Sequence, residues 1–158
     1  MKRLFVAWLL ISLGMPLARA TDKDSLRGVK AFGVLVEEVQ GPEELRTSDF
    51  QTDVELRCRE AGIKLDNSAL DYLYIEVHAL QVQFEDGRPT GRYALAVSVE
   101  FRQWASLVRD PSIHAFAATW SAGGLGTVSS RDLRSFSRES VRDKVEKFLN
   151  AFLEQNPK

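Results

Sequence analysis

The chain has 158 residues, with 21 Lys and Arg against 22 Asp and Glu, and a single cysteine, Cys58. This length fits one domain with a single core. One cysteine excludes an internal disulfide framework, and together with two separated histidines, His78 and His114, it excludes a zinc site built from Cys and His ligands. We expect no metal and no cofactor.

The first twenty residues carry the features of a secretory signal peptide. A basic start is followed by an apolar stretch from Leu4 to Leu13, and the segment ends in small residues at Ala18 and Ala20. This pattern is typical of a leader that is cleaved on export, which predicts a signal peptide at 1–20 and one domain at 21–158. The apolar stretch is too short for a transmembrane helix, which needs about 20 residues.

Export from a bacterium predicts a periplasmic or secreted protein, cleaved near Ala20. No cysteine stands at the cleavage site, so we expect no lipid anchor and no transmembrane segment. The chain from residue 21 onward keeps 18 basic and 22 acidic residues. This small net negative charge disfavours binding to nucleic acid or to anionic membranes, because both need clustered positive charge. The expected partner is another protein of the cell envelope.

The first predicted elements are a strand and a helix. Residues 29–39, VKAFGVLVEEV, are mostly apolar or β-branched, which predicts a strand buried on both faces. Ser48 with Gln51 three residues later predicts a capping box at the start of a helix, and Gly62 predicts its end. The apolar stripe of this helix is Phe50, Val54, Cys58 and Ala61. Cys58 is therefore interpreted as a small buried hydrophobic residue.

Alternating apolar and polar residues predict two more strands, at 73–80 and 92–103. In each, one set of alternate side chains is apolar and the other is small or polar, which indicates a sheet with one packed face and one face in water. A fourth strand is predicted at 114–120, with Phe116 and Trp120 on its heavier face.

The segment from about Ser137 to Gln155 predicts a second amphipathic helix. Its apolar positions are Val141, Val145, Phe148, Leu149, Phe152 and Leu153. The order of elements is β-α-β-β-β-α, which predicts an α+β domain with a four-stranded mixed sheet, two helices on one face and a right-handed first crossover.

The glycines at 123, 124 and 126 lie in the stretch ATWSAGGLGTVSS, residues 117–129. A phosphate-binding loop would need a lysine after the last glycine, and a dinucleotide site would need a β-α-β unit. No lysine occurs between Lys64 and Lys144, and the β-α-β unit of the predicted order precedes the glycines instead of following them. We interpret the glycines as a bulge or hairpin before a short strand.

Two functional alternatives involve specific side chains. His78 shares the outward face of its strand with Glu76, so a small hydrolase could use His78 with Glu76 or Glu100, although a surface ion pair also explains the arrangement. Neither G-x-S-x-G nor H-E-x-x-H occurs. A second alternative is a carrier of a small apolar ligand, held between the sheet and the C-terminal helix. The residues expected around that ligand are Tyr93, Phe101, Phe148 and Phe152.

The polar face of the sheet supports a third hypothesis, a non-enzymatic adaptor that binds another protein. Small side chains would form its floor, and Trp and Arg, which are favoured at the energetic centres of interfaces, would stand at its edge. The candidate binding residues are Glu76, His78, Ser98, Glu100, Arg102 and Trp104. The alternative is that these side chains are polar only because this face of the sheet is exposed to solvent, and that they have no role in binding. The exposed edge strand could also accept a partner strand.

A resemblance supports this hypothesis. The stretches YALAVSVEFRQWASLVRDP, ATWS and VRDKVEKFLNAFLEQNPK resemble small exported bacterial proteins of unknown function. The order of elements, with AGI closing the first helix, is similar to the N-terminal domain of TolB and to envelope accessory proteins of the curli-secretion and lipopolysaccharide-assembly kind. The resemblance implies a binding or scaffolding role in the cell envelope, without a cofactor.

Overall fold

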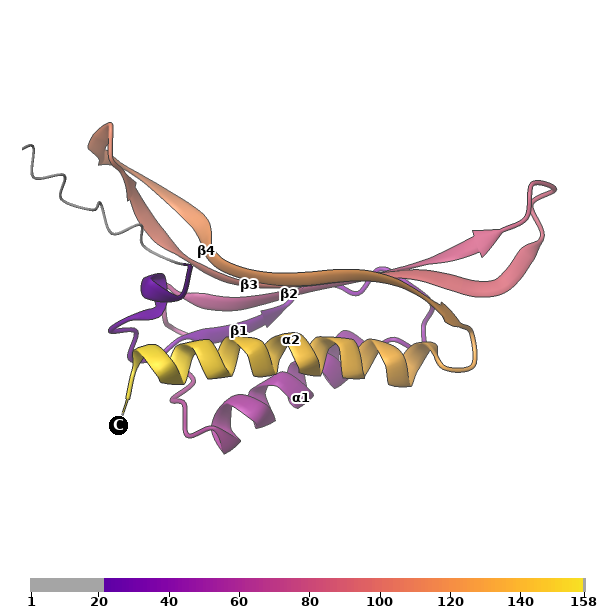
Figure 1. Cartoon of the computed structure of the whole chain (residues 1–158), viewed down its shortest axis with the longest axis horizontal. Coiled ribbons are helices and arrows are strands. Elements are labelled where there is room, and N and C mark those ends of the chain that lie inside the picture. The colour runs from indigo at the N-terminus through magenta and orange to yellow at the C-terminus, as the bar shows by residue number, and fades with distance from the viewer. Residues whose placement is uncertain (1–21, 158) are drawn as a thin grey trace, which may run out of the picture.

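The computed structural model of the protein describes residues 22–157 (Figure 1). The elements in chain order are the 3-10 helix η1 (Asp22–Leu26), β1 (Gly33–Val36), α1 (Thr47–Glu60), β2 (Tyr72–Gln83), β3 (Pro89–Leu107), β4 (Asp110–Ser129) and α2 (Leu133–Gln155). The predicted β-α-β-β-β-α order is confirmed. The predicted signal peptide lies outside the described residues.

The four strands form one mixed sheet in the order β1-β2-β3-β4. β1 runs parallel to β2, and the other two pairs are antiparallel. Figure 1 shows α1 and α2 together beneath one face of this sheet. We call the opposite face the outer face; no element of residues 22–157 covers it (Figure 1). The predicted α+β class, with two helices on one face, is confirmed.

Two hairpins extend past the helices. β3 has 19 residues and β4 has 20, against about 5–6 in a typical strand. Their ends form a β2–β3 arm (residues 80–91) and a β3–β4 arm (residues 104–116). Both arms curve away from the helices, so the outer face is concave between them (Figure 1).

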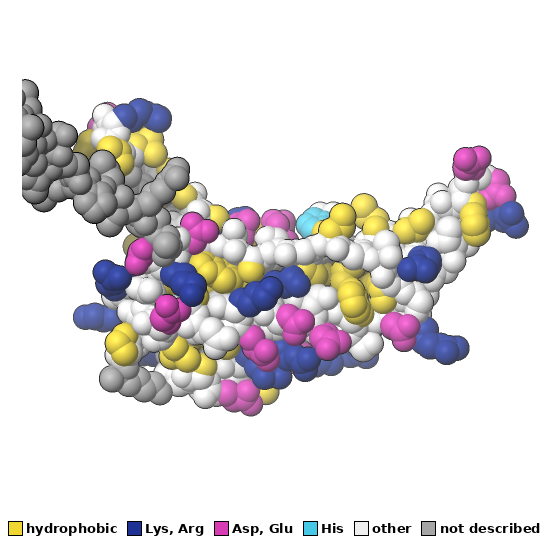
Figure 2. All heavy atoms as spheres, viewed as in Figure 1, with side chains coloured by type: hydrophobic (Ala, Val, Ile, Leu, Met, Phe, Trp, Pro, Cys, Tyr) yellow, Lys and Arg dark blue, Asp and Glu magenta, His cyan; other side chains and the backbone are white. Residues whose placement is uncertain are grey.

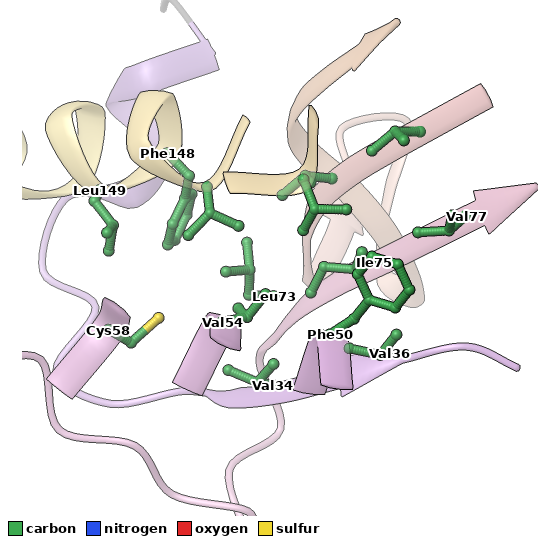
Figure 3. Close-up of a cluster of buried hydrophobic side chains, with 14 of the residues drawn as sticks. Val34, Val36, Phe50, Val54, Cys58, Leu73, Ile75, Val77, Phe148 and Leu149 are labelled. Carbon is green, nitrogen blue, oxygen red and sulfur yellow. The ribbon is translucent and has the colours of Figure 1, made fainter. Parts of the chain in front are cut away.

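The core lies between the sheet and the helices. Alternate side chains of β2 and β3 point toward the helices and are buried, as the alternation predicts. Figure 3 shows how β1, β2 and the two helices contribute to one cluster, with Phe148 above Leu73. The ring centroid of Phe148 lies 5.4 Å from those of Phe32 and Phe101 and 5.3 Å from that of Trp120. Each such buried side chain contributes about 1.5–3 kcal/mol through the hydrophobic effect.

The first strand is much shorter than predicted and is not buried on both faces. β1 covers only Gly33–Val36, and Leu35 is 47% exposed on the outer face. β1 is an edge strand of a sheet whose helices lie on one face only, so its outward side chains meet water. The prediction rested on the nearly continuous apolar run of residues 29–39, a pattern that usually marks a strand covered on both faces.

The start of α1 also differs from the prediction. Its N-cap is Arg46, without a side-chain capping bond, so the predicted capping box is wrong. Gln51 instead contacts the backbone of β1. The predicted end is confirmed: Gly62 has a φ of 76°, and the N–H of Ile63 donates to the carbonyl oxygen of Cys58.

The glycine stretch is neither a loop nor a hairpin, because Gly123, Gly124 and Gly126 lie inside the continuous strand β4. The irregularity of register is elsewhere. Phe101 pairs with Trp120 but Arg102 pairs with Ala118, so Thr119 is an extra residue. This bulge places Trp120 against the helices, where it is buried, and the exposed Phe116 on the other face. The prediction that both face the same way is wrong.

The C-terminal helix begins four residues earlier than predicted, at Leu133. The hydroxyl of Ser137 is buried and donates to the carbonyl oxygen of Leu133 inside the helix. The predicted apolar stripe is confirmed except at Leu153, which is 36% exposed. Cys58 is fully buried, as predicted.

Candidate functional site: the outer face of the sheet

The outer face brings most of the predicted binding residues together. Glu76 pairs directly with Ser98 across β2 and β3, so both point away from the helices. His78 follows on the same face of β2, and Glu100 and Arg102 follow on β3. Each of these side chains is half-buried. The structure therefore places five of the six candidates on one continuous surface.

Arg102 is the centre of a cluster of side chains on this surface. Its guanidinium lies 2.8 Å from a carboxylate oxygen of Glu100 and 3.9 Å from one of Glu76. The guanidinium carbon also lies 3.5 Å from the centroid of the Tyr74 ring. These contacts combine a charge-assisted hydrogen bond with a cation–π interaction. Only 28% of the Arg102 side chain is exposed, so its position is well determined by its neighbours.

Two members of this cluster were not predicted. Tyr74 precedes Glu76 on β2, and Glu37 follows the end of β1. The hydroxyl of Tyr74 donates to the carboxylate of Glu37. The alternation of β2 shows that Tyr74 shares a face with Glu76. The position of Glu37 depends on β1 pairing in parallel with β2, which a single sequence does not reveal.

The carboxylates of the cluster have opposite pKa shifts. The hydrogen bond from Tyr74 lowers the pKa of Glu37. Burial, followed by the neighbouring carboxylate of Glu37, raises the pKa of Glu76. The hydrogen bond to Glu37 raises the pKa of Tyr74 to about 12. The cluster therefore keeps a negative charge on Glu37 at neutral pH, with Arg102 beside it.

The acid–base pair proposed for a hydrolase is not assembled in the structure. Glu100 pairs with Tyr74, four residues along β2 from His78, which corresponds to about 13 Å. Glu100 bonds to Arg102 instead. Glu76 and His78 share the outer face, but no hydrogen bond joins them among residues 22–157. Direct proton transfer between such groups needs contact of about 3 Å.

Trp104, the sixth candidate, lies farther along β3, on the β3–β4 arm. Its ring centroid is 5.8 Å from that of Phe116, the residue opposite it on β4. Both side chains are exposed, Trp104 by 56%. Farther along the arm, Val108 is fully exposed and Ile113 is 44% exposed. The arm therefore carries an apolar surface beside the charged cluster.

Charged and hydrophobic side chains lie on different parts of the molecule. Figure 2 shows basic and acidic side chains interleaved along the helices and hydrophobic side chains on both raised arms.

A groove of about 680 Å³ also lies between α1 and α2. Its arginines are paired: Arg138 bonds to Asp53, and Arg57 lies 3.4 Å from Glu146. Ion pairs between α1 and α2 therefore occupy these charged groups of the groove.

The space expected to hold an apolar ligand is filled by aromatic rings. Phe101 and Phe148 are stacked, with centroids 5.4 Å apart, and Phe152 lies 5.8 Å from Phe148. Tyr93 is eight residues from Phe101 on β3, about 27 Å along the strand, so it does not join them. Within residues 22–157 no three His, Cys, Asp or Glu side chains gather as metal ligands. No helix in this range is long and apolar enough to cross a membrane.

No protein-family model and no curated protein sequence matches this chain. Several solved structures are similar. A dodecameric PelC variant from Paraburkholderia phytofirmans is 20% identical, with 75% of this chain and 86% of that chain covered and a TM-score of 0.45. A hypothetical protein from Chlamydia trachomatis is 13% identical, with 81% and 99% covered and a TM-score of 0.44.

A minor lipoprotein from Acinetobacter baumannii is 12% identical, with 80% of this chain and 94% of that chain covered and a TM-score of 0.37. All three similarities lie below 25% identity and below a TM-score of 0.5. These similarities therefore assign no function to this chain.

Proposed function

We propose that the protein is a non-enzymatic adaptor of the bacterial cell envelope that binds another protein with the concave outer face of its sheet. One observation carries the proposal: the helices cover only one face, and the uncovered face holds both the Arg102 cluster and the exposed Trp104. Arg and Trp are the residue types most enriched at the energetic centres of protein interfaces. The leader-like residues 1–20 support a location in the envelope.

The fixed position of Arg102 favours binding. A free arginine on a protein surface loses side-chain entropy when a partner orders it, which costs about 0.5–1.5 kcal/mol. Glu100 and Tyr74 already hold Arg102 from two sides. Most of the entropy cost of ordering Arg102 therefore falls on folding and not on binding, so a partner binds a guanidinium that is already in position.

The charges of the outer face indicate the chemistry of the partner. Three carboxylates, those of Glu37, Glu76 and Glu100, surround the single guanidinium of Arg102. This excess of acidic groups favours a partner surface with Lys or Arg at the matching position. The aromatic pair of Trp104 and Phe116 favours an apolar side chain next to those basic groups.

Affinity purification from periplasmic extract tests the proposal. We expect the wild-type protein to retain a partner that Trp104→Ala loses. Arg102→Glu should lose it too, because the substitution removes the cation that holds Glu76 and Glu100 in place. Arg131→Glu and Leu56→Ala are matched controls, since both residues are exposed and neither lies on the outer face. The proposal is wrong if no partner is retained, or if the outer-face variants retain the same partner as fully as the two controls.

A further inference from the structure

The two edge strands of the sheet, β1 and β4, differ in whether their outward backbone groups are hydrogen-bonded. The β1 edge is closed by α1: the side-chain oxygen of Gln51 accepts from the N–H of Val36 at 3.1 Å, and its amide donates to the carbonyl oxygen of Val34 at 3.0 Å. Two of the backbone groups that β1 would offer to another strand are therefore already bonded. Proteins commonly protect edge strands in this way, because open edges pair with other chains.

The part of the β4 edge that follows the Thr119 bulge has no protecting side chains. Residues 115–130 contain no charged residue and no proline, the two side-chain devices that most often prevent edge pairing. The N–H of Ser130 donates to the carbonyl oxygen of Gly91 in β3. Because N–H directions alternate along a strand, those of Gly123, Leu125 and Thr127 point away from β3. β4 therefore presents a row of backbone donors and acceptors at the side of the molecule.

Helix α2 adds two side chains to this edge. A Cβ atom on Gly124 would lie 3.4 Å from the amine of Lys144, and a Cβ atom on Gly126 would lie 3.7 Å from the ring of Phe136. Both distances are ordinary van der Waals contacts, so Lys144 and Phe136 lie against the β4 backbone at these positions. Phe136 is 39% exposed, and no carboxylate within residues 22–157 forms an ion pair with Lys144. A cation therefore lies beside Gly124 and an aromatic ring beside Gly126, two positions farther along the edge.

We propose that β4 is the interface of a symmetric homodimer, in which the β4 strands of two copies pair antiparallel with Leu125 on the two-fold axis. This goes beyond the proposed adaptor function, since the outer faces of both copies stay open. Pairing over residues 121–129 of each copy would join the two sheets into one of eight strands. A two-fold axis makes the same edge complementary to itself, because antiparallel strands exchange their outward donors and acceptors in pairs.

The side chains favour a second copy of this chain in this register. Leu125 is 82% exposed on the outer face and would pack against the partner's Leu125. On the helix side, Gly124 would lie opposite the partner's Gly126. Lys144 would then face the partner's Phe136, and Phe136 would face the partner's Lys144, which gives two cation–π contacts.

Cysteine crosslinking tests the register directly. Opposite residues of a hydrogen-bonded antiparallel pair have Cα atoms about 5.5 Å apart, which a disulfide spans. We expect Leu125→Cys to form an intermolecular disulfide readily under mild oxidation. Leu80→Cys is a matched control, because Leu80 is also an exposed leucine of the outer face. Thr127→Cys is a second control, since the two Thr127 residues would be offset by four positions, about 13 Å.

The proposal is overturned if Leu125→Cys crosslinks no faster than Leu80→Cys, or if Thr127→Cys crosslinks as fast as Leu125→Cys. It is also overturned if sedimentation equilibrium shows the wild-type protein to be a monomer at all concentrations. A monomer whose Arg102→Glu variant still loses the partner would remove the dimer alone and leave the adaptor function standing.

Two substitutions at Leu125 separate backbone pairing from side-chain contact. Leu125→Pro removes an outward N–H that β3 does not use, and proline is tolerated on edge strands, so the fold should persist. We expect this variant to weaken dimerisation about tenfold or more, while Leu125→Ala, which keeps the N–H, weakens it less. Circular dichroism checks that both variants are folded. Equal dimerisation of Leu125→Pro and wild type would contradict strand pairing.

Discussion

The guanidinium carbon of Arg102 lies 3.5 Å from the centroid of the Tyr74 ring. The two residues come from different strands, β3 and β2, and meet diagonally, because Tyr74 pairs directly with Glu100. Glu100 accepts a 2.8 Å hydrogen bond from Arg102 on one side while the ring covers the guanidinium on another. The arrangement fixes a cation on a face that no helix of residues 22–157 covers.

A double-mutant cycle measures this contact. We expect Arg102→Met and Tyr74→Leu each to lower the free energy of unfolding, and their combination to cost less than the sum of the two. The coupling energy should be about 0.5–1 kcal/mol, the usual value for a partly exposed cation–π pair. Urea unfolding of the four proteins provides the measurement. A coupling energy of zero would show that the contact does not stabilise the fold.

The raised pKa of Glu76 predicts a pH-dependent effect of its removal. Burial and then the carboxylate of Glu37 make Glu76 bind its proton more tightly in the folded state than in the unfolded state. Ionisation of Glu76 therefore costs stability as the pH rises through and above its ordinary value of 4.5. We expect Glu76→Gln to become more stable, relative to wild type, on going from pH 3.5 to pH 7 (about the range in which carboxylates titrate).

Glu37→Gln is the control for this prediction and should change in the opposite direction. The hydrogen bond from Tyr74 lowers the pKa of Glu37, so its ionised form contributes stability above the ordinary carboxyl pKa and loses it as the pH falls. Unfolding by urea at both pH values compares the variants. Parallel pH profiles for wild type and Glu76→Gln would contradict the assigned shift.

The contact between Gln51 and β1 predicts a cost for its removal. Gln51→Ala leaves the N–H of Val36 and the carbonyl oxygen of Val34 without their side-chain partner. We expect a loss of about 1–3 kcal/mol in the free energy of unfolding. Thr52→Ala, at the next position of α1, alters an exposed side chain and should change stability by less than about 0.5 kcal/mol. Thermal and urea unfolding check both, and equal stability of the two variants would refute the role of Gln51.

The thiol of Cys58 should be unreactive in the folded protein. Burial raises its pKa to about 12, and the nearby Glu55 carboxylate adds to the shift. Since the thiolate is the reactive form, a disulfide reagent at pH 8 (about the pKa of a free thiol) should label the native protein at least about a hundredfold more slowly than the urea-unfolded chain. An exposed thiol in Cys58→Ala/Leu80→Cys provides the fast reference. Rapid labelling of the native wild type would contradict the buried position.

The alternating strands and the C-terminal helix could be predicted because their patterns are local. The period of two in β2 and β3 identified the covered and uncovered faces, and that assignment holds: Val97 is buried under the helices and Glu76 is not. It therefore also placed five of the six candidate residues on one surface. The helical period identified Val145 and Phe148 as core residues.

The features that could not be predicted depend on contacts between residues that are distant in the sequence. Nothing local marks Thr119 as the extra residue that separates Phe116 from Trp120, because that bulge is defined only by the register with β3. Gln51 had the spacing of a capping residue but bonds to β1, which precedes it by 15 positions. Glu37 joins the Arg102 cluster only because β1 pairs with β2. Each of these features follows from the tertiary arrangement.

Site-specific photocrosslinking in the cell tests the central claim, that the outer face binds a protein, most directly. A photoreactive amino acid at Ser98, in the middle of the outer face, should give one discrete adduct that disappears in the Arg102→Glu background. The same amino acid at Lys147, exposed on α2, should give none. A discrete adduct from Lys147 with no adduct from Ser98 would show that the partner binds the helical side, and the account would be wrong.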